Sequence, residues 1–192
     1  MAFEGGEATG KTTQARLLAE RLGAVLTREP GGTEVGERVR ELVLDPAVRV
    51  DVRAEALLMA AARAQHVAEV IEPALAAGRH VVTDRFTASS LAYQGVGRGL
   101  GVDEVAGLSS YATGGLEPDM VLLLDLPLET AAARLSNEPD RLEREGAPFH
   151  ARVSAAFRQL AGADPARWAV VPADGTVDEV AAKVWEAVNR LP

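Results

Sequence analysis

A glycine-rich segment near the N-terminus constrains this chain more than any other feature. Residues 5–12 read Gly-Gly-Glu-Ala-Thr-Gly-Lys-Thr and match the phosphate-loop pattern G-x-x-x-x-G-K-[ST] at every fixed position. In such a loop, backbone N–H groups surround phosphates, the lysine reaches the outer phosphates and the final hydroxyl binds Mg2+. Lys11 is one of only two lysines in the chain. The segment therefore predicts a nucleotide-phosphate site at Lys11 and Thr12.

The residues after the loop predict the helix that this motif needs. Residues 12–22 place apolar side chains on one face at spacings of i, i+3, i+4 and i+7, and Gly23 follows as a helix end. A plain glycine-rich turn before an amphipathic helix is the alternative interpretation, and the motif together with its helix makes it less favoured. The strand expected before the loop has only residues 1–4 available, so it must be unusually short.

Length and composition are those of one folded domain. The chain has 192 residues, of which 47% are apolar and 25% charged. No apolar run is long enough to span a bilayer and no signal-peptide pattern opens the chain, which predicts a cytoplasmic protein without a membrane partner. The net charge of −8 argues against a nucleic-acid binder, which needs a broad basic face. Without cysteine, the chain forms no disulfide and has no thiolate nucleophile.

Alternation of apolar runs with helical patterns predicts an α/β fold. Continuous apolar runs, as in buried parallel strands, occupy residues 24–27, 80–83, 120–125 and 168–171. Helical patterns separate these runs, and the longest extends from Asp51 to Ala77. We therefore expect a parallel sheet with helices on both faces and ligands beyond the carboxyl ends of the strands. Without a linker or repeat, residues 1–192 are expected to form a single domain.

Charged residues follow three of the predicted strands. Arg28 lies in the segment TREPGGT after the second strand, and Asp84 and Arg85 end the third. An arginine at such a position can bind phosphate, and a carboxylate can hold Mg2+ through water. Asp125 follows the fourth strand, and the pattern alone does not separate it from Asp84 as the metal carboxylate. Each of these residues also has an ordinary interpretation as part of a turn or a helix cap.

The sequence pattern alone assigns no site to four further arginines. Arg63 lies within an alanine-rich helical segment, where a charge usually points to solvent. Arg134, Arg141 and Arg144 lie in a segment with proline, asparagine and mixed charges, and most such clusters are simply solvated. A phosphoryl-transfer enzyme, however, needs a lid that brings positive charge and excludes water.

Three segments together resemble the bacterial thymidylate kinases. They are the phosphate loop, TREPGGT at residues 27–33, and DRF at residues 84–86 followed by SSLAYQ at residues 89–94. The resemblance implies transfer of the γ-phosphoryl group of ATP to dTMP, which gives dTDP and ADP and uses Mg2+. It also implies a P-loop NTPase fold with a five-stranded parallel sheet, a short lid at about residues 134–147 that carries arginine, and a homodimer.

The resemblance also implies a role for each motif residue. Lys11, Arg85 and Arg141 would be catalytic, with Arg141 as the lid arginine because the phosphate loop has no basic residue before Lys11. Thr12 and Asp84 would hold Mg2+, which favours Asp84 over Asp125. The implied ATP-binding residues are Gly5, Gly6, Glu7, Ala8, Thr9, Gly10, Lys11, Thr12, Thr13 and Arg134. The implied acceptor-binding residues are Glu7, Arg28, Arg40, Met59, Arg63, Arg85, Ser90, Tyr93 and Gln94.

The implied acceptor site has three parts. Arg28 and Arg85, with Arg40 nearby, would bind the acceptor phosphate. Arg63 would hydrogen-bond the thymine ring, which reverses the expectation that it points to solvent. Ser90 and Gln94 would complete base recognition, Tyr93 would pack against the deoxyribose, and Glu7 would lie near the sugar 3′-hydroxyl.

Met59 leaves alternatives open for the acceptor. The family usually stacks a phenylalanine on thymine at this position, one helical turn before the arginine. Methionine covers a ring face without aromatic stacking, which loses roughly 0.5–1.5 kcal/mol. A kinase for another nucleoside monophosphate is therefore an alternative, and a nucleotide-dependent switch protein is another. Guanine-reading switches carry N-K-x-D, which is absent here because Lys183, the lysine besides Lys11, follows Ala182.

Overall fold

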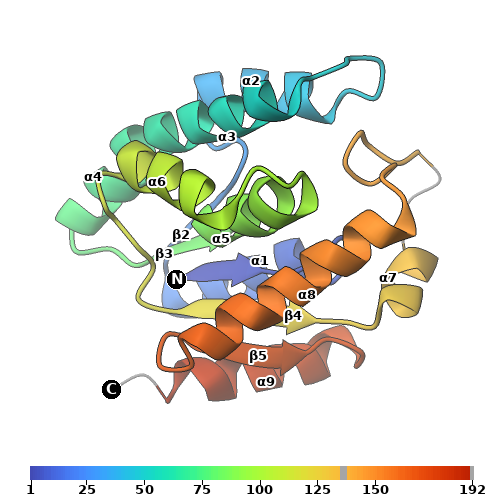
Figure 1. Ribbon diagram of the computed structural model, residues 1–192. Coiled ribbons are helices and arrows are strands. Elements are labelled where there is room, and N and C mark those ends of the chain that lie inside the picture. The colour runs from blue at the N-terminus through green and yellow to red at the C-terminus, as the bar shows by residue number, and fades with distance from the viewer. Residues whose placement is uncertain (135–137, 191–192) are drawn as a thin grey trace.

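A five-stranded parallel sheet forms the centre of the fold (Figure 1). The computed structural model describes residues 1–134 and 138–190. The strands are β1 (Ala2–Glu4), β2 (Val25–Arg28), β3 (Val81–Asp84), β4 (Val121–Asp125) and β5 (Trp168–Pro172). Their order across the sheet is β2-β3-β1-β4-β5 and every neighbouring pair is parallel, which confirms the predicted sheet.

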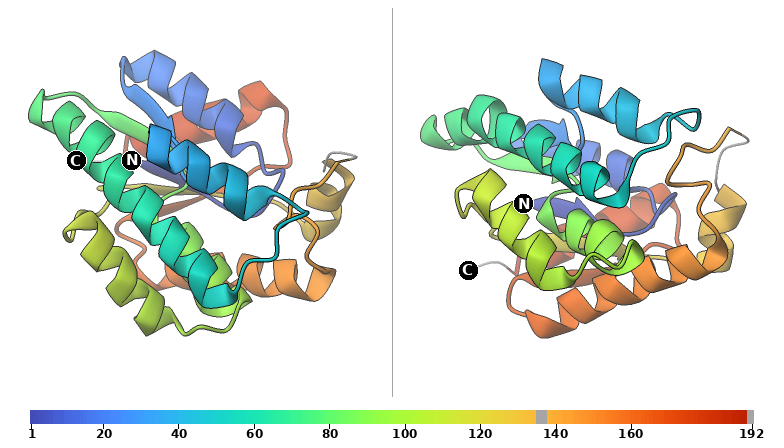
Figure 2. Two further views of the ribbon diagram at one scale, coloured as in Figure 1. Left: turned by 90° about the horizontal axis from the view of Figure 1, so that it is seen from above. Right: turned by 45° about the horizontal axis from the view of Figure 1, so that its top comes forward.

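Helices cover both faces of the sheet (Figures 1 and 2). α1 (Lys11–Leu22) and α9 (Val177–Val188) pack on one face, against side chains of β1, β3 and β4. The layer on the other face contains α3, α5, α6 and α8, and α2 packs on the outside of α3. The remaining bounds are α2 (Glu34–Leu44), α3 (Val52–His66), η1 (Val67–Ile71), α4 (Glu72–Ala76), α5 (Thr87–Ser90), η2 (Leu91–Gly97), α6 (Val102–Thr113), α7 (Leu128–Arg134) and α8 (Ala147–Ala163). Each helix within the described ranges is too short or too polar to span a membrane.

β1 is as short as the sequence indicates, yet it holds the central position. Its three residues are fully buried, and it pairs with β3 on one side and β4 on the other. Two-sided pairing satisfies the backbone groups of so short a strand. The phosphate loop therefore leaves the sheet at its centre, between the carboxyl ends of β3 and β4.

The long helix predicted from Asp51 to Ala77 is continuous but not uniform. Asp51 caps its start by accepting a hydrogen bond from Arg53 N at 2.9 Å, and Gly78, with φ of 70°, follows its end. Between α3 and α4 the backbone widens into the π-helical turn η1. Pro73 follows this turn directly and has no N–H group to continue the α-helical ladder, so the bonding pattern changes there.

Glu4, at the end of β1, connects the central strand to the segment after β3. Its side chain is fully buried. Its Oε1 accepts hydrogen bonds from Phe86 N at 2.9 Å and Ser89 N at 3.2 Å, and its Oε2 accepts one from Ser89 Oγ at 2.6 Å. Burial raises the pKa of Glu4 to about 7, although these hydrogen bonds and the charge of Arg85 oppose that rise. The start of α5 is thus fixed to the strand that carries the phosphate loop.

We predict that Glu4 makes the stability of this protein depend on pH. The unfolded chain loses this proton near pH 4.5 and the folded protein near pH 7, so the folded state binds more protons between these values. The free energy of unfolding should therefore fall as pH rises from about 4.5 to about 7, by up to about 3 kcal/mol. Urea unfolding of the wild type and of Glu4→Gln over this range measures the difference.

The matched control is Glu34→Gln, because the side chain of Glu34 is 83% exposed. This variant should follow the pH profile of the wild type, and only Glu4→Gln should flatten it. Parallel profiles for the wild type and Glu4→Gln would contradict the raised pKa.

Candidate active site

The loop between β1 and α1 has a backbone that only its glycines allow. Gly5 has φ of 142°, and a Cβ atom there would lie 2.6 Å from Leu124 O. Gly10, with φ of 90°, turns the chain into α1, which begins at Lys11. The first N–H groups of α1 and their partial positive charge therefore face the space that the loop surrounds, where an anion is stabilised.

Lys11 spans this loop. Its ammonium group donates to Gly6 O at 2.5 Å and to Thr9 Oγ1 at 3.4 Å, and the side chain is buried. Burial lowers the pKa of Lys11 to about 8; the charge of Arg85 acts in the same direction, and the carboxylate of Glu7 partly opposes it. A phosphate bound in the loop would favour the charged form of this lysine.

Thr12 and Asp84 meet at the start of α1. Thr12 Oγ1 donates to Asp84 Oδ2 at 2.5 Å. Asp84 Oδ1 is buried and has no hydrogen-bond partner among the described residues. A hydroxyl oxygen beside an unused carboxylate oxygen fits Mg2+, which usually takes one or two protein ligands together with water and phosphate. Asp125, the alternative carboxylate, instead pairs with Arg158 at 2.9 Å.

Arg85 lies above the phosphate loop in a left-handed backbone conformation, with φ of 71°. Its guanidinium donates to Glu7 Oε1 at 2.7 Å, Gly5 O at 3.0 Å and Ser89 Oγ at 3.0 Å. Tyr93 OH also donates to Glu7. Burial alone would raise the pKa of Glu7, but the charges of Arg85 and Lys11 outweigh it and bring this pKa to about 2. The site therefore holds a carboxylate in contact with a guanidinium group, and an ammonium group near enough for its charge to act on that carboxylate.

A pocket of about 80 Å³ opens beside this cluster, lined from α2, α3, α5 and η2. Every acceptor-binding residue implied by the resemblance lines it except Arg28. The residues brought together are Glu7, Arg40, Met59, Arg63, Arg85, Ser90, Tyr93 and Gln94. Arg28 is half exposed and pairs with Glu37 at 2.9 Å.

Arg63 is buried in this pocket, so the helical-pattern expectation that it points to solvent is wrong. Only 3% of its side chain is exposed. It donates to Glu29 Oε2 at 2.7 Å and Ser90 Oγ at 3.0 Å. Glu29 also contacts His66 Nδ1 at 2.8 Å. The role of Glu29 is not predicted from the sequence. The available signal is the spacing of Arg63 and His66, which puts two donors on one helix face.

The predicted lid is described from residue 138 onward, and its residues 135–137 lie outside the described part of the chain. Arg141 donates to Val43 O at 2.7 Å and Glu55 Oε2 at 2.5 Å, which directs it toward α2 and α3. Arg144 is exposed and donates to Pro139 O at 2.9 Å. Arg134, at the end of α7, donates across to Ala173 O at 3.3 Å, beside the loop after β5.

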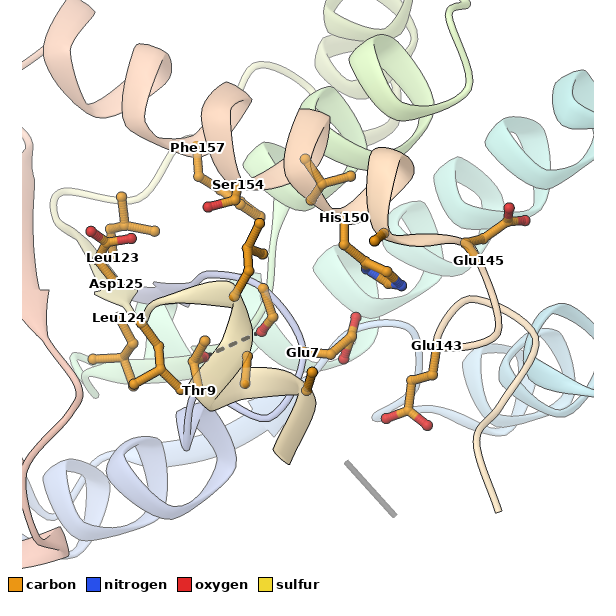
Figure 3. A pocket seen from close by; sticks show the side chains of 17 residues that line it. Glu7, Thr9, Leu123, Leu124, Asp125, Glu143, Glu145, His150, Ser154 and Phe157 are labelled. Carbon is orange, nitrogen blue, oxygen red and sulfur yellow. Dashed lines mark hydrogen bonds between the residues drawn. The ribbon is translucent and has the colours of Figure 1, made fainter. Parts of the chain in front are cut away.

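A second cavity, of about 240 Å³, lies between β4, α7, α8 and the phosphate loop (Figure 3). Its walls are mostly apolar, and His150 of α8 lies near Glu7 of the loop at one side. Glu143 and Glu145 reach it from the lid. Sequence reasoning did not predict this cavity, which separates the lid from the loop.

Comparisons with known proteins agree with this geometry. The family model described as "Thymidylate kinase" matches residues 3–184. A thymidylate kinase of Synechococcus sp. (strain JA-2-3B'a(2-13)) is 52% identical over 200 residues, covering 100% of this chain and 95% of the relative. The thymidylate kinase of Deinococcus radiodurans is 48% identical over 199 residues, covering 99% of this chain and 96% of the relative.

A solved structure extends the similarity to three dimensions. The crystal structure of thymidylate kinase from Ehrlichia chaffeensis superposes with a TM-score of 0.82 at 30% sequence identity, and the match covers 97% of this chain and 96% of that one. A family match over nearly the whole length, close relatives and a shared fold lead to one conclusion: the chain belongs to the thymidylate kinase family.

Proposed function

We propose that this protein transfers the γ-phosphoryl group of ATP to dTMP and so produces dTDP and ADP. The observation that carries the proposal is the position of the Arg63 pocket. It opens directly beside Glu7 and Arg85, which contact the phosphate loop. An acceptor nucleotide in the pocket and a donor in the loop would therefore present their phosphates to each other across Arg85.

The donor side of the proposal uses the loop and the start of α1. Backbone N–H groups from Gly5 to Thr13 would bind the ATP phosphates, and Lys11 would neutralise charge that develops during transfer. Arg134, beside the loop after β5, would contact the adenine end. Because the acceptor is already an anionic phosphate oxygen, the reaction needs no general base; positioning and charge neutralisation carry it.

Mg2+ is part of the proposal, and Thr12 and Asp84 are the residues that would hold it. The unused Asp84 Oδ1 and the adjacent hydroxyl support this assignment. When bound, the ion supplies charge neutralisation between phosphate oxygens. In the described ranges, no three histidine, aspartate or glutamate side chains gather as a metal site, which fits an ion held largely by phosphate and water.

The acceptor side uses the pocket residues. Arg85 would bind the dTMP phosphate with Arg40 nearby, and Arg28 would join after leaving Glu37. That half-exposed pair is weak, on the order of 0–1 kcal/mol, so a phosphate can replace the carboxylate. Arg63, Ser90 and Gln94 would read the base, Met59 would cover it, and Tyr93 and Glu7 would meet the sugar.

We further propose a cytoplasmic homodimer with no nucleic-acid or membrane partner, formed by one domain over residues 1–192. Exposed apolar side chains on the outer helices support the dimer: Leu57 of α3 is 58% exposed and Tyr111 of α6 is 90% exposed. Both helices lie in the same outer layer (Figure 2). We propose that these two side chains belong to the surface that the other copy would cover.

An acceptor panel tests the proposed reaction. With ATP and Mg2+, ADP release should depend on added acceptor and should be fastest with dTMP, because the pocket presents Arg63 and Gln94 to the base. The panel contains dTMP, dUMP, dAMP and a blank without acceptor, and chelation of Mg2+ should abolish turnover in each case. Preference for dAMP would favour the alternative that this protein is a kinase for another nucleoside monophosphate. Met59, in place of the usual phenylalanine, is the residue that suggests this alternative. Turnover in the blank would favour a switch or ATPase.

Arg141, proposed as the catalytic lid arginine, is tested against its neighbour Arg144. A lid arginine that stabilises transferring phosphate is worth roughly 10^3–10^5 in rate. Arg141→Ala should lower kcat by at least about 10^3 while dTMP affinity, measured by calorimetry, changes little.

Arg144→Ala is the control and should keep kcat close to wild type. If Arg144→Ala loses turnover instead, the role passes to Arg144. A lower melting temperature of Arg141→Ala with nearly normal kcat would show that its contacts with Glu55 and Val43 only anchor the lid.

A further inference from the structure

We infer that Glu55 is a specificity-determining positioning residue, which fixes the side-chain amide of Gln94 so that its carbonyl oxygen faces the nucleobase. The inference rests on the proposed function, in which Gln94 meets the base. Glu55 decides whether Gln94 presents a hydrogen-bond acceptor or a donor to the base.

The side-chain amide of Gln94 is bound by Glu55 on the side away from the pocket. Gln94 is 2% exposed and lines the acceptor pocket together with Arg63. Its Nε2 donates to Glu55 Oε1 at 2.8 Å. A side-chain amide has its acceptor oxygen and its donor nitrogen on opposite sides. With the nitrogen turned toward Glu55, the carbonyl oxygen is turned toward the side that a ligand can reach.

The chemistry of Glu55 excludes the opposite orientation. Glu55 is fully buried and also accepts hydrogen bonds from Arg98 Nη2 at 3.1 Å and Arg141 Nη2 at 2.5 Å. Burial acts to raise its pKa, but the donors Gln94, Arg98 and Arg141 outweigh burial and lower it. An ionised carboxylate only accepts hydrogen bonds, so a flipped Gln94 would place its carbonyl oxygen against a negative charge.

The resulting pocket matches one kind of pyrimidine. Thymine and uracil carry an N–H group beside a carbonyl group, whereas cytosine carries a bare ring nitrogen beside an amino group. The carbonyl oxygen of Gln94 accepts from the N–H group, and Arg63, which only donates, binds the carbonyl group. Cytosine would place its bare ring nitrogen against the carbonyl oxygen of Gln94 and its amino group against the donors of Arg63. Both pairs would lack a hydrogen bond, and a pocket that leaves buried polar groups unpaired strongly disfavours such a ligand.

The substitution Glu55→Gln should reverse the amide of Gln94. The new side chain keeps one carbonyl oxygen, and this oxygen should take the Oε2 position, where two guanidinium groups donate. At the Oε1 position Gln94 can turn its amide, and only the longer contact from Arg98 Nε at 3.2 Å loses its acceptor. The NH2 group of the new side chain then faces Gln94. Gln94 should respond by turning its own carbonyl oxygen away from the base and its NH2 group toward it.

The measurement is kcat/KM of the wild type and Glu55→Gln for dTMP, dUMP and dCMP at saturating ATP. We expect the dTMP-to-dCMP ratio to fall at least about tenfold, as loss of a matched hydrogen bond implies. The dTMP-to-dUMP ratio should change less than about threefold, because both bases present the same edge to Gln94. A disturbance that acts only through Arg141 or the lid would lower all three values alike and leave both ratios unchanged.

Arg98→Gln is the matched control variant. It removes two contacts to the same carboxylate, from Arg98 Nε at 3.2 Å and Nη2 at 3.1 Å, but leaves the contact of Gln94 with Glu55 intact. Its dTMP-to-dCMP ratio should stay within about threefold of wild type. An equal fall of this ratio in Arg98→Gln and Glu55→Gln would overturn the inference, because general loosening of the network would then explain it.

Folding is checked by circular dichroism and melting temperature, because Glu55→Gln leaves two partly buried guanidinium groups beside a neutral side chain. If this variant is unfolded at the assay temperature, the double variant Glu55→Gln with Arg98→Met replaces it, because it removes one negative and one positive charge. Its dTMP-to-dCMP ratio should fall in the same way. An unchanged ratio in a folded variant overturns the role of Glu55 while dTMP turnover by the wild type leaves the proposed function standing. A wild type without dTMP turnover overturns both.

Discussion

Mutual compensation of buried charges at the carboxyl edge of the sheet is the constraint on which the rest of this structure depends. Glu7 contacts Arg85 directly, Lys11 is near enough for its charge to act on Glu7, and all three side chains are largely removed from water. An isolated buried charge costs several kcal/mol, and the carboxylate of Glu7 offsets part of that cost for both cations. The pairing of Glu7 with Arg85 fixes Arg85 in a left-handed conformation above the loop. The sheet order contributes to this cluster, because β1 lies next to β3 and so brings the loop beside Arg85, which follows the end of β3.

Two acidic residues hold polar side chains that line the pocket proposed for the acceptor. Glu29 binds Arg63 from behind, and Glu55 binds Gln94 in the same way. Neither carboxylate needs to touch the acceptor to affect it. Groups that are held in place before the ligand arrives lose little conformational freedom on binding, so affinity is not spent on ordering them. In the proposed function, recognition of the base therefore depends also on the carboxylates that hold Arg63 and Gln94 in place.

Local features of this protein could be predicted from its sequence, and long-range pairings could not. The phosphate loop and the strands follow from spacing and apolar runs that act over a few residues. The residues that the resemblance implies for the base, Met59, Arg63, Ser90 and Gln94, line one pocket. The periodicity of an alanine-rich helix gave the wrong environment for Arg63, because its partner Glu29 lies 34 positions upstream. The orientation of Arg141 toward Glu55 could not be predicted from the sequence for the same reason, because the two residues lie 86 positions apart.

The lowered pKa of Lys11 links this site to the proton concentration of its surroundings. With a value of about 8 in the free protein, part of the population lacks the ammonium charge under mildly alkaline conditions. A polyphosphate bound in the loop would stabilise the ammonium form, so its binding would take up a proton from solvent whenever the lysine begins neutral. Donor affinity would then weaken as pH rises, even where the transfer step itself is unaffected. Burial of the lysine would thus couple nucleotide binding to proton uptake.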